Sequence, residues 1–123
     1  METILILHGW GIGSKTWIQV KEKLKKEGWR VYTPDLPGFG KCPAPKKPWA
    51  LDDYVLWVRD YCEQNNLSQF VLAGHSFGGG LAVKFTSIFP EKIKKLVLVA
   101  PKIRRQRGYR YYLGVVLSKL GAV

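Results

Sequence analysis

Short apolar runs alternate with helix-patterned segments along this chain, and the alternation limits the fold more than any other feature. Four runs are apolar and rich in strand-forming residues: Thr3–Leu7, Trp29–Thr33, Phe70–Ala73 and Leu96–Ala100. Runs of this length that end at turn residues predict strands buried on both faces. Strands that alternate with helices predict an α/β fold, with a parallel sheet, right-handed crossovers and helices on both faces.

Three segments between these runs have apolar residues at helical spacing. The first starts at Ser14 as the N-cap residue and stops at Gly28, and the second covers about Leu51 to Gln64. The third follows Ser76 and ends before Pro90. The residues expected to face the core are Trp17, Val20 and Leu24 in the first helix, Leu51, Tyr54, Val55, Val58, Tyr61 and Cys62 in the second, and Leu81, Phe85 and Ile88 in the third.

The charge of the chain is strongly positive, with a formal net value of +11 over 123 residues. Lysines and arginines are spread along the sequence, and only Lys102 to Arg110 is dense. A solvated basic surface explains this distribution, so we expect no nucleic-acid partner. An alternative is that Lys102 to Arg110 binds RNA or a membrane surface, which predicts binding that weakens steeply with salt.

The two cysteines, Cys42 and Cys62, lie in no CxxC pair and in no cluster of metal-ligating residues. We therefore expect two free thiols in a reducing cytoplasm, with no metal and no cofactor. The opening residues Met1-Glu2-Thr3 lack the basic and long apolar regions of a signal peptide. No run approaches the ~20 apolar residues of a membrane span, so we expect no membrane-spanning helix.

The segment Gly74-His75-Ser76-Phe77-Gly78 fits the pattern G-x-S-x-G, and it lies between a predicted strand and a predicted helix. In that context the pattern indicates a nucleophile elbow, a sharp turn that holds the serine in a strained conformation. Side chains at Gly74 and Gly78 would collide with the turn, so these two glycines support it structurally. Ser76 is the predicted nucleophile, exposed at the top of the sheet and facing the N-terminus of the following helix.

A second motif, His8-Gly9-Trp10-Gly11, follows the first predicted strand. Acyl transfer creates a negatively charged oxygen, and two backbone N–H donors commonly stabilise it. The N–H groups of Trp10 and Phe77 are the candidates for this oxyanion hole. The carboxyl ends of parallel strands share one edge of a sheet, so the two motifs are expected to meet there, with Gly9 supporting the loop.

Together these segments resemble the α/β-hydrolase superfamily. The resemblance rests on His8-Gly9-Trp10-Gly11, on Asp35-Leu36-Pro37-Gly38-Phe39-Gly40 and on Gly74-His75-Ser76-Phe77-Gly78-Gly79, and it runs from about Thr3 to Pro101. It implies strands three to six of the family fold, with the first strand here between the second and the third. It also implies two parts: residues 1–101 as the amino-terminal half of the hydrolase core, and residues 102–123 as the start of a helical cap that is cut short.

The same resemblance implies a serine hydrolase that acts on small acyl substrates of the ester or amide type, through an acyl-enzyme on Ser76. The family activates its serine with a histidine and an acid that follow it in the chain. After Ser76 this sequence has no histidine and no aspartate, and its only carboxylate is Glu91. We expect His75 to point away from the base position and His8 to brace the oxyanion loop, while Asp35 ties its own turn.

A serine without a base is a poor nucleophile at neutral pH, so the chain alone is expected to be nearly inactive. The last predicted strand, Leu96–Ala100, is apolar on both faces but lies at the edge, which favours self-association. We therefore expect an incomplete chain that lacks the triad histidine and acid, either a fragment or a degenerate copy. The alternative is a non-catalytic α/β-hydrolase-like protein that binds a partner or a lipid through its sheet edge and cap helix.

Overall fold

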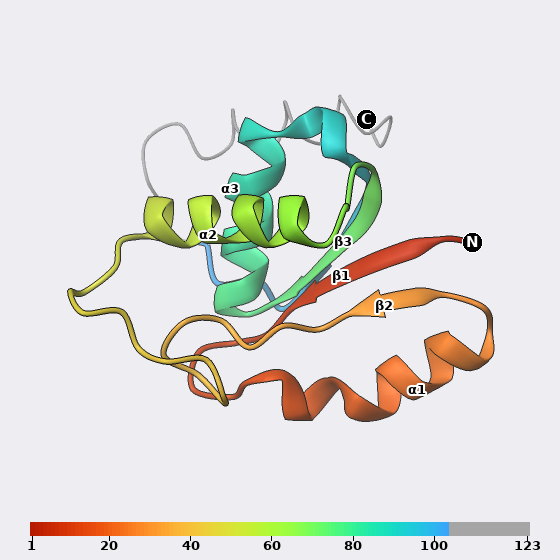
Figure 1. Cartoon of the computed structure of the whole chain (residues 1–123), viewed down its shortest axis with the longest axis horizontal. Helices are drawn as coiled ribbons and strands as arrows, with labels where there is room; N and C mark the ends of the chain where they lie inside the picture. The colour runs from red at the N-terminus through yellow and green to blue at the C-terminus, as the bar shows by residue number, and fades with distance from the viewer. Residues whose placement is uncertain (104–123) are drawn as a thin grey trace.

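A parallel sheet of four strands, in the order β2-β1-β3-β4, organises the part of the chain that the computed structural model describes, residues 1–103 (Figure 1). The strands are β1 (Thr3–Leu7), β2 (Arg30–Tyr32), β3 (Phe70–His75) and β4 (Ile93–Val99). β1 pairs in parallel with both β2 and β3, and β3 pairs in parallel with β4. The predicted α/β class is confirmed, and so is the place of the first strand between the second and the third.

Helices lie on both faces of this sheet (Figure 1). They are α1 (Ile18–Lys26), α2 (Leu51–Gln64) and α3 (Phe77–Ile88), with short 3-10 turns η1 (Ser14–Trp17) and η2 (Pro90–Lys92). α2 and α3 cover one face, where their side chains pack with Leu5, Leu7 and Leu72. The segment of η1 and α1 covers the other face, where Trp17 and Leu24 pack on Ile4 and Ile6.

The burial of β1 explains why its sequence is apolar at every position. Ile4, Leu5, Ile6 and Leu7 are all buried, and successive side chains point to opposite helical layers. A strand covered on both sides has no face for polar residues, so it carries a continuous apolar run. The bounds of β1 agree with the predicted strand.

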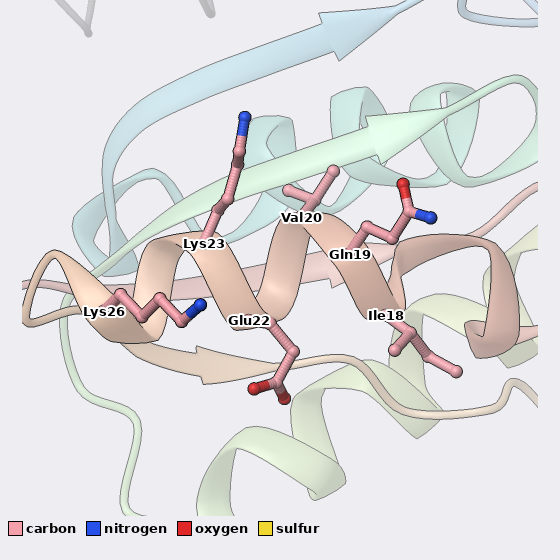
Figure 2. A pocket seen from close by; sticks show the side chains of 6 residues that line it. All are labelled: Ile18, Gln19, Val20, Glu22, Lys23 and Lys26. Carbon is pink, nitrogen blue, oxygen red and sulfur yellow. The ribbon is translucent and has the colours of Figure 1, made fainter.

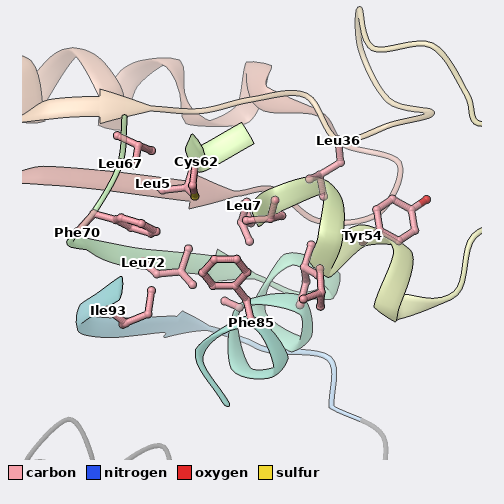
Figure 3. Close-up of a cluster of buried hydrophobic side chains, with 14 residues drawn as sticks. Leu5, Leu7, Leu36, Tyr54, Cys62, Leu67, Phe70, Leu72, Phe85 and Ile93 are labelled. Atoms are coloured by element: carbon pink, nitrogen blue, oxygen red, sulfur yellow. The ribbon is translucent and has the colours of Figure 1, made fainter. Parts of the chain in front are cut away.

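The larger core lies between the sheet and the layer of α2 and α3 (Figure 3). Phe70 and Phe85 are fully buried there, and their ring centroids lie 6.4 Å apart. The predicted inward face of α2 is confirmed: its buried members are Tyr54, Val55, Val58 and Cys62, and Leu51 and Tyr61 pack against them as partly buried residues. The observed bounds of α2, Leu51–Gln64, match the prediction.

Two predicted core positions are wrong. Val20 is 40% exposed, because the side of the η1 and α1 segment that faces the sheet carries the partly buried Trp17, Lys21 and Leu24, and Val20 lies beside that side. Ile88 is 49% exposed at the end of α3, and Phe89 takes the packed position instead. The ring of Phe89 lies 5.0 Å from that of Phe85.

The bounds of three strands and the cap of the first helical segment differ from the sequence-based prediction. β3 extends two residues further, to His75, and β4 starts at Ile93 rather than Leu96, since Lys94 and Lys95 are exposed strand residues. β2 is shorter by one residue at each end. Ser14 is not an N-cap: Gly13 holds that position without a side-chain bond, and the backbone N–H of Ser14 donates to Oδ1 of Asp35 at 2.8 Å.

β4 is one of the two edge strands of the sheet among residues 1–103, and β2 is the other. Val97 and Val99 are 45% and 43% exposed, so the predicted apolar edge is present in the described part of the chain. The predicted cap helix within residues 102–123 lies almost wholly outside the described residues.

Candidate active site

The strained residue of the site is Ser76, which stands between the last residue of β3 and the first residue of α3. Its backbone has φ 52° and ψ −117°, in a region that residues with a side chain rarely adopt. Such a conformation costs about 1–3 kcal/mol and persists only where the surroundings hold it. The structure therefore contains the sharp strand-to-helix turn that the sequence motif indicates.

Two glycines make this turn sterically feasible. A Cβ atom added to Gly74 would overlap the carbonyl oxygen of Gly78, one turn further along the chain. A Cβ atom added to Gly78 would overlap the carbonyl oxygen of Leu7, at the end of β1. Glycine at these two positions lets the start of α3 approach both β3 and β1 closely.

The segment after β4 holds the backbone of Ser76 in place. The N–H of Ser76 donates to the carbonyl oxygen of Val99 at 3.1 Å, and its carbonyl oxygen accepts from the N–H of Lys102 at 2.8 Å. A Cβ atom added to Gly79 would lie 2.7 Å from Cβ of Pro101, and one added to Gly80 would lie 2.5 Å from the carbonyl oxygen of Lys102. Sequence reasoning missed this contact, although the run of three glycines was its visible signal.

The oxyanion loop after β1 passes directly against the elbow. A Cβ atom added to Gly9 would lie 3.3 Å from Cβ of Ser76, and the rings of Trp10 and Phe77 have centroids 5.1 Å apart. Among residues 1–103, neither the backbone N–H of Trp10 nor that of Phe77 donates a hydrogen bond. Phe77 begins α3, where the first N–H groups have no partner within the helix and the dipole favours negative charge.

His8 is buried, with 1% of its surface exposed, and both ring nitrogens are engaged. The backbone N–H of Leu36 donates to Nε2 at 2.9 Å. The proton of the neutral ring is thereby assigned to Nδ1, which donates to the carbonyl oxygen of Gly9 at 2.8 Å. His8 therefore joins the loop after β1 to the loop after β2 and has no free nitrogen to accept a proton from Ser76.

His75 lies on the α1 side of the sheet. Its partly buried ring meets the ring of Trp17 edge to face, with centroids 6.2 Å apart. The side chains of β3 alternate, so His75 shares a face with Ala73 and the smaller core. In the described part of the chain no hydrogen bond joins its ring to Ser76.

Asp35 ties two turns beside the oxyanion loop. Its carboxylate accepts from the N–H of Ser14 at 2.8 Å and from the N–H of Lys41 at 3.1 Å. Burial acts to raise the pKa of this carboxyl, but these hydrogen bonds outweigh it and hold the pKa below the usual 3.8. The predicted bond of Asp35 to its own turn is confirmed, and the bond to Ser14 adds a link to the segment before α1.

Rings from four segments gather next to the elbow, and we call Trp10, Phe39, Trp49, Tyr54 and Phe77 the aromatic cluster. Trp10 meets Phe39, Phe77 and Tyr54 edge to face, with centroids 4.8, 5.1 and 6.5 Å apart. Tyr54 in turn meets Phe77 at 5.3 Å and Trp49 at 5.1 Å. Sequence reasoning did not find this cluster, because its members are scattered over 68 positions, from residue 10 to residue 77.

The rest of the surface of residues 1–103 shows weaker candidates for a functional site. A shallow hollow lies on the outer side of α1, lined by Ile18, Gln19, Val20, Glu22, Lys23 and Lys26 (Figure 2). All six residues come from one helix, and none is a nucleophile. Within residues 1–103, no three His, Cys, Asp or Glu side chains gather as a metal site would require, and no helix there is long and apolar enough to cross a bilayer.

The parallel sheet and the strained turn at Ser76 together are typical of one class of protein. Comparison of the chain with known protein families identifies that class. A family model described as the alpha/beta hydrolase fold matches residues 2–113. The chain belongs to the α/β-hydrolase family, a family of hydrolases, as the sequence motifs predict.

Individual relatives agree with this assignment. An uncharacterized protein of Mycobacterium tuberculosis is 35% identical over 97 residues, which are 79% of this chain and 28% of that protein. The mouse (lyso)-N-acylphosphatidylethanolamine lipase is 33% identical over 102 residues, 80% of this chain and 30% of the lipase. The structure of an esterase from Exiguobacterium antarcticum superposes with a TM-score of 0.81 at 26% identity, covering 89% of this chain and 42% of that one. This chain spans less than a third of the length of these two curated relatives.

Proposed function

We propose that this chain carries the nucleophile and the oxyanion hole of a serine hydrolase that acts on small acyl substrates of the ester or amide type. The observation that carries the proposal is the strained backbone of Ser76, at φ 52°, directly before α3. Strain of this kind concentrates at functional sites, where it presents a side chain to a ligand. The esterase and lipase names among the relatives support the same class of substrate.

In the proposed reaction, the hydroxyl of Ser76 gives its proton to a general base while Oγ attacks the carbonyl carbon. The carbonyl oxygen becomes negative and accepts hydrogen bonds from the N–H groups of Trp10 and Phe77. The carbon–oxygen or carbon–nitrogen bond of the leaving group then breaks, the leaving group takes the proton, and the acyl group stays on Ser76. Water releases the acid in the same way. Each oxyanion donor is worth roughly 10²–10³ in turnover.

The general base is proposed to come from outside this sequence, together with the acid that orients it. Both ring nitrogens of His8 are occupied, and His75 lies on the α1 side of the sheet. Removal of the base of a serine hydrolase costs on the order of 10⁶ in turnover, so the 123-residue chain alone is expected to turn over substrate very slowly.

A serine-reactive fluorophosphonate probe tests the proposal on the full-length gene product. We expect covalent labelling that is lost in Ser76→Ala and retained in Ser87→Ala, a matched variant whose hydroxyl only bonds to the carbonyl oxygen of Lys84 within α3. An unlabelled protein, or equal labelling of the Ser76→Ala variant, would refute the assignment of the nucleophile.

A second candidate function is that of a non-catalytic α/β-hydrolase-like binding protein. The observation that favours it is that neither histidine of the sequence is placed to serve Ser76. Reading the genome beyond the codon of Val123 distinguishes the two candidates. A continuing frame with an aspartate or glutamate and a late histidine favours the enzyme, whereas an immediate stop codon with no neighbouring fragment favours the binding protein.

We also propose a cytoplasmic location and self-association through the β4 edge. The thiols of Cys42 and Cys62 are both unpaired, which fits a reducing compartment. The exposed side chains of Val97 and Val99 supply an apolar strip along the edge. Cell fractionation and sedimentation velocity test the two proposals separately.

A further inference from the structure

The side chain of Trp10 is unusually exposed for a residue with so many aromatic neighbours. Its exposed fraction is 61%, although it contacts the rings of Phe39, Phe77 and Tyr54. Burial of a large apolar side chain such as an indole stabilises a protein, and an indole that stays in water does not make this contribution. Phe39, Trp49 and Phe77 are partly buried beside it, so together these rings present an apolar surface next to the candidate nucleophile that a ligand could cover.

The surrounding rings hold Trp10 in one orientation. Phe39 meets it at an interplanar angle of 76°, and Phe77 meets it at 79°. Phe77 is itself in contact with Tyr54, and Tyr54 with Trp49, so the contacts form one continuous chain of rings. A side chain that is already fixed loses little conformational entropy when a ligand binds to it.

The position of the aromatic cluster fixes which part of a substrate it meets. Trp10 and Phe77 would hold the carbonyl oxygen through their backbone N–H groups, so their rings, which are in contact with each other, would lie close to the reacting carbonyl group. The acyl group stays bound through both halves of the proposed reaction, while the leaving group departs after the first. A surface beside the candidate oxyanion hole that binds the acyl group can therefore contribute to both the formation and the hydrolysis of the acyl-enzyme.

We propose that the aromatic cluster binds the acyl group of the substrate and selects acyl groups that carry an aromatic ring. The inference rests on the proposed function, whose site it deepens. Aromatic rings attract one another in edge-to-face and offset-stacked arrangements beyond what area burial provides, and saturated rings of the same size do not. The net charge of +11 disfavours cationic ligands, the other class that an indole face recognises.

The test compares two acids that differ only in aromaticity, benzoate and cyclohexanecarboxylate. Each is titrated into ¹⁵N-labelled protein, and affinities are measured from shifts of the Trp10 indole and backbone N–H signals. We expect benzoate to bind about 3- to 10-fold more tightly, the range that an aromatic pair provides. Trp10→Leu should reduce the preference to less than about twofold, while Trp57→Leu, on the outer part of α2 and stacked on Tyr61, should keep it.

Phe39→Leu is the second variant, since it removes a ring that meets both Trp10 and His8 edge to face and keeps the side chain of Trp10 itself. It should lower the benzoate preference by at least about twofold. The inference is overturned if the wild-type protein binds the two acids equally or binds neither, or if the Trp10→Leu and Phe39→Leu variants keep the full preference. The binding assay needs no reaction at Ser76 and should give the same preference in Ser76→Ala. A protein that is not labelled by the fluorophosphonate probe can therefore still show the benzoate preference, and the two proposals can fail independently.

Discussion

The Nε2 atom of His8 accepts a hydrogen bond from the backbone N–H of Leu36 at 2.9 Å, although the two residues are 28 positions apart. The bond fixes the loop that carries Trp10 against the loop that follows β2. Through its other nitrogen His8 also holds the carbonyl oxygen of Gly9, the residue before Trp10. The geometry of the candidate oxyanion hole thus depends on a buried histidine whose two ring nitrogens are both engaged in hydrogen bonds.

Replacement of His8 by alanine should lower the stability of the protein. The buried N–H of Leu36 would lose its partner and a cavity would form, so we expect a loss of about 2–4 kcal/mol in the free energy of unfolding. Urea unfolding measures it. His75→Ala is the matched control and should cost less than about 1 kcal/mol, because its ring is partly exposed. A His8→Ala protein as stable as the wild type would contradict this structural role of His8.

Replacement of Ser76 by glycine should stabilise the fold relative to Ser76→Ala. Glycine adopts a positive φ without the clash that alanine keeps, so the Ser76→Gly variant is expected to be more stable by about 1 kcal/mol. Both variants lose the hydroxyl, so any difference between them comes from the backbone. Equal unfolding midpoints in urea would show that the elbow is not strained.

Replacement of Gly80 by alanine tests the contact between α3 and the segment after β4. In an ordinary helix interior this change stabilises a protein by roughly 0.5–1 kcal/mol. Here the new Cβ would lie 2.5 Å from the carbonyl oxygen of Lys102, so we expect a loss of about 1–3 kcal/mol instead. Ser87→Ala in the same helix should change stability by less than about 0.5 kcal/mol. A stabilised Gly80→Ala variant would contradict the packing described here.

The lowered pKa of the Asp35 carboxyl should make the protein less stable at acidic pH. Because its pKa in the folded protein lies below the usual 3.8, its contribution to stability is fully present well above that value. The contribution is lost as the pH falls through the folded-state pKa, since protonation breaks the bonds to Ser14 and Lys41. Melting temperatures of wild type and Asp35→Asn, measured from pH 2 to pH 7, should differ most at neutral pH and converge below pH 3.8. A constant difference would exclude the linkage.

Replacement of Val97 by lysine should weaken self-association. The change places a charge in the apolar strip of β4, where pairing with a second copy would bury it. Sedimentation velocity should show a shift towards monomer at equal concentration. Val20→Lys introduces the same charge at an exposed valine of α1 and should leave the distribution unchanged. Identical sedimentation of wild type and Val97→Lys would argue against pairing through this edge.

Local patterns in the sequence were sufficient to predict most of the fold. β1 and α2 match their predicted bounds because each is fixed by the spacing of its own apolar residues. Periodicity alone did not fix which side of α1 faces the sheet or where the packed part of α3 ends, which is why Val20 and Ile88 were assigned to the core wrongly. Gly13 takes the cap position predicted for Ser14, and the backbone N–H of Ser14 is bound by Asp35, which is 21 positions away.

Only those parts of the candidate site that are formed by consecutive residues could be predicted from the sequence. The elbow around Ser76 is one short segment, so its pattern could be recognised directly. The support of that elbow comes from Val99 and Lys102, and the aromatic cluster draws on four separate segments. Such contacts depend on how strands pair and helices pack, and no local pattern encodes them.

The bonds from Ser76 to Val99 and Lys102 also set an order of events during synthesis. The strained turn is costly on its own, and the groups that restrain it are translated more than twenty residues after the serine. A nascent polypeptide released before Val99 would contain the whole G-x-S-x-G motif and yet lack its shape. We therefore expect the proposed nucleophile to reach its strained conformation only once β4 has paired with β3.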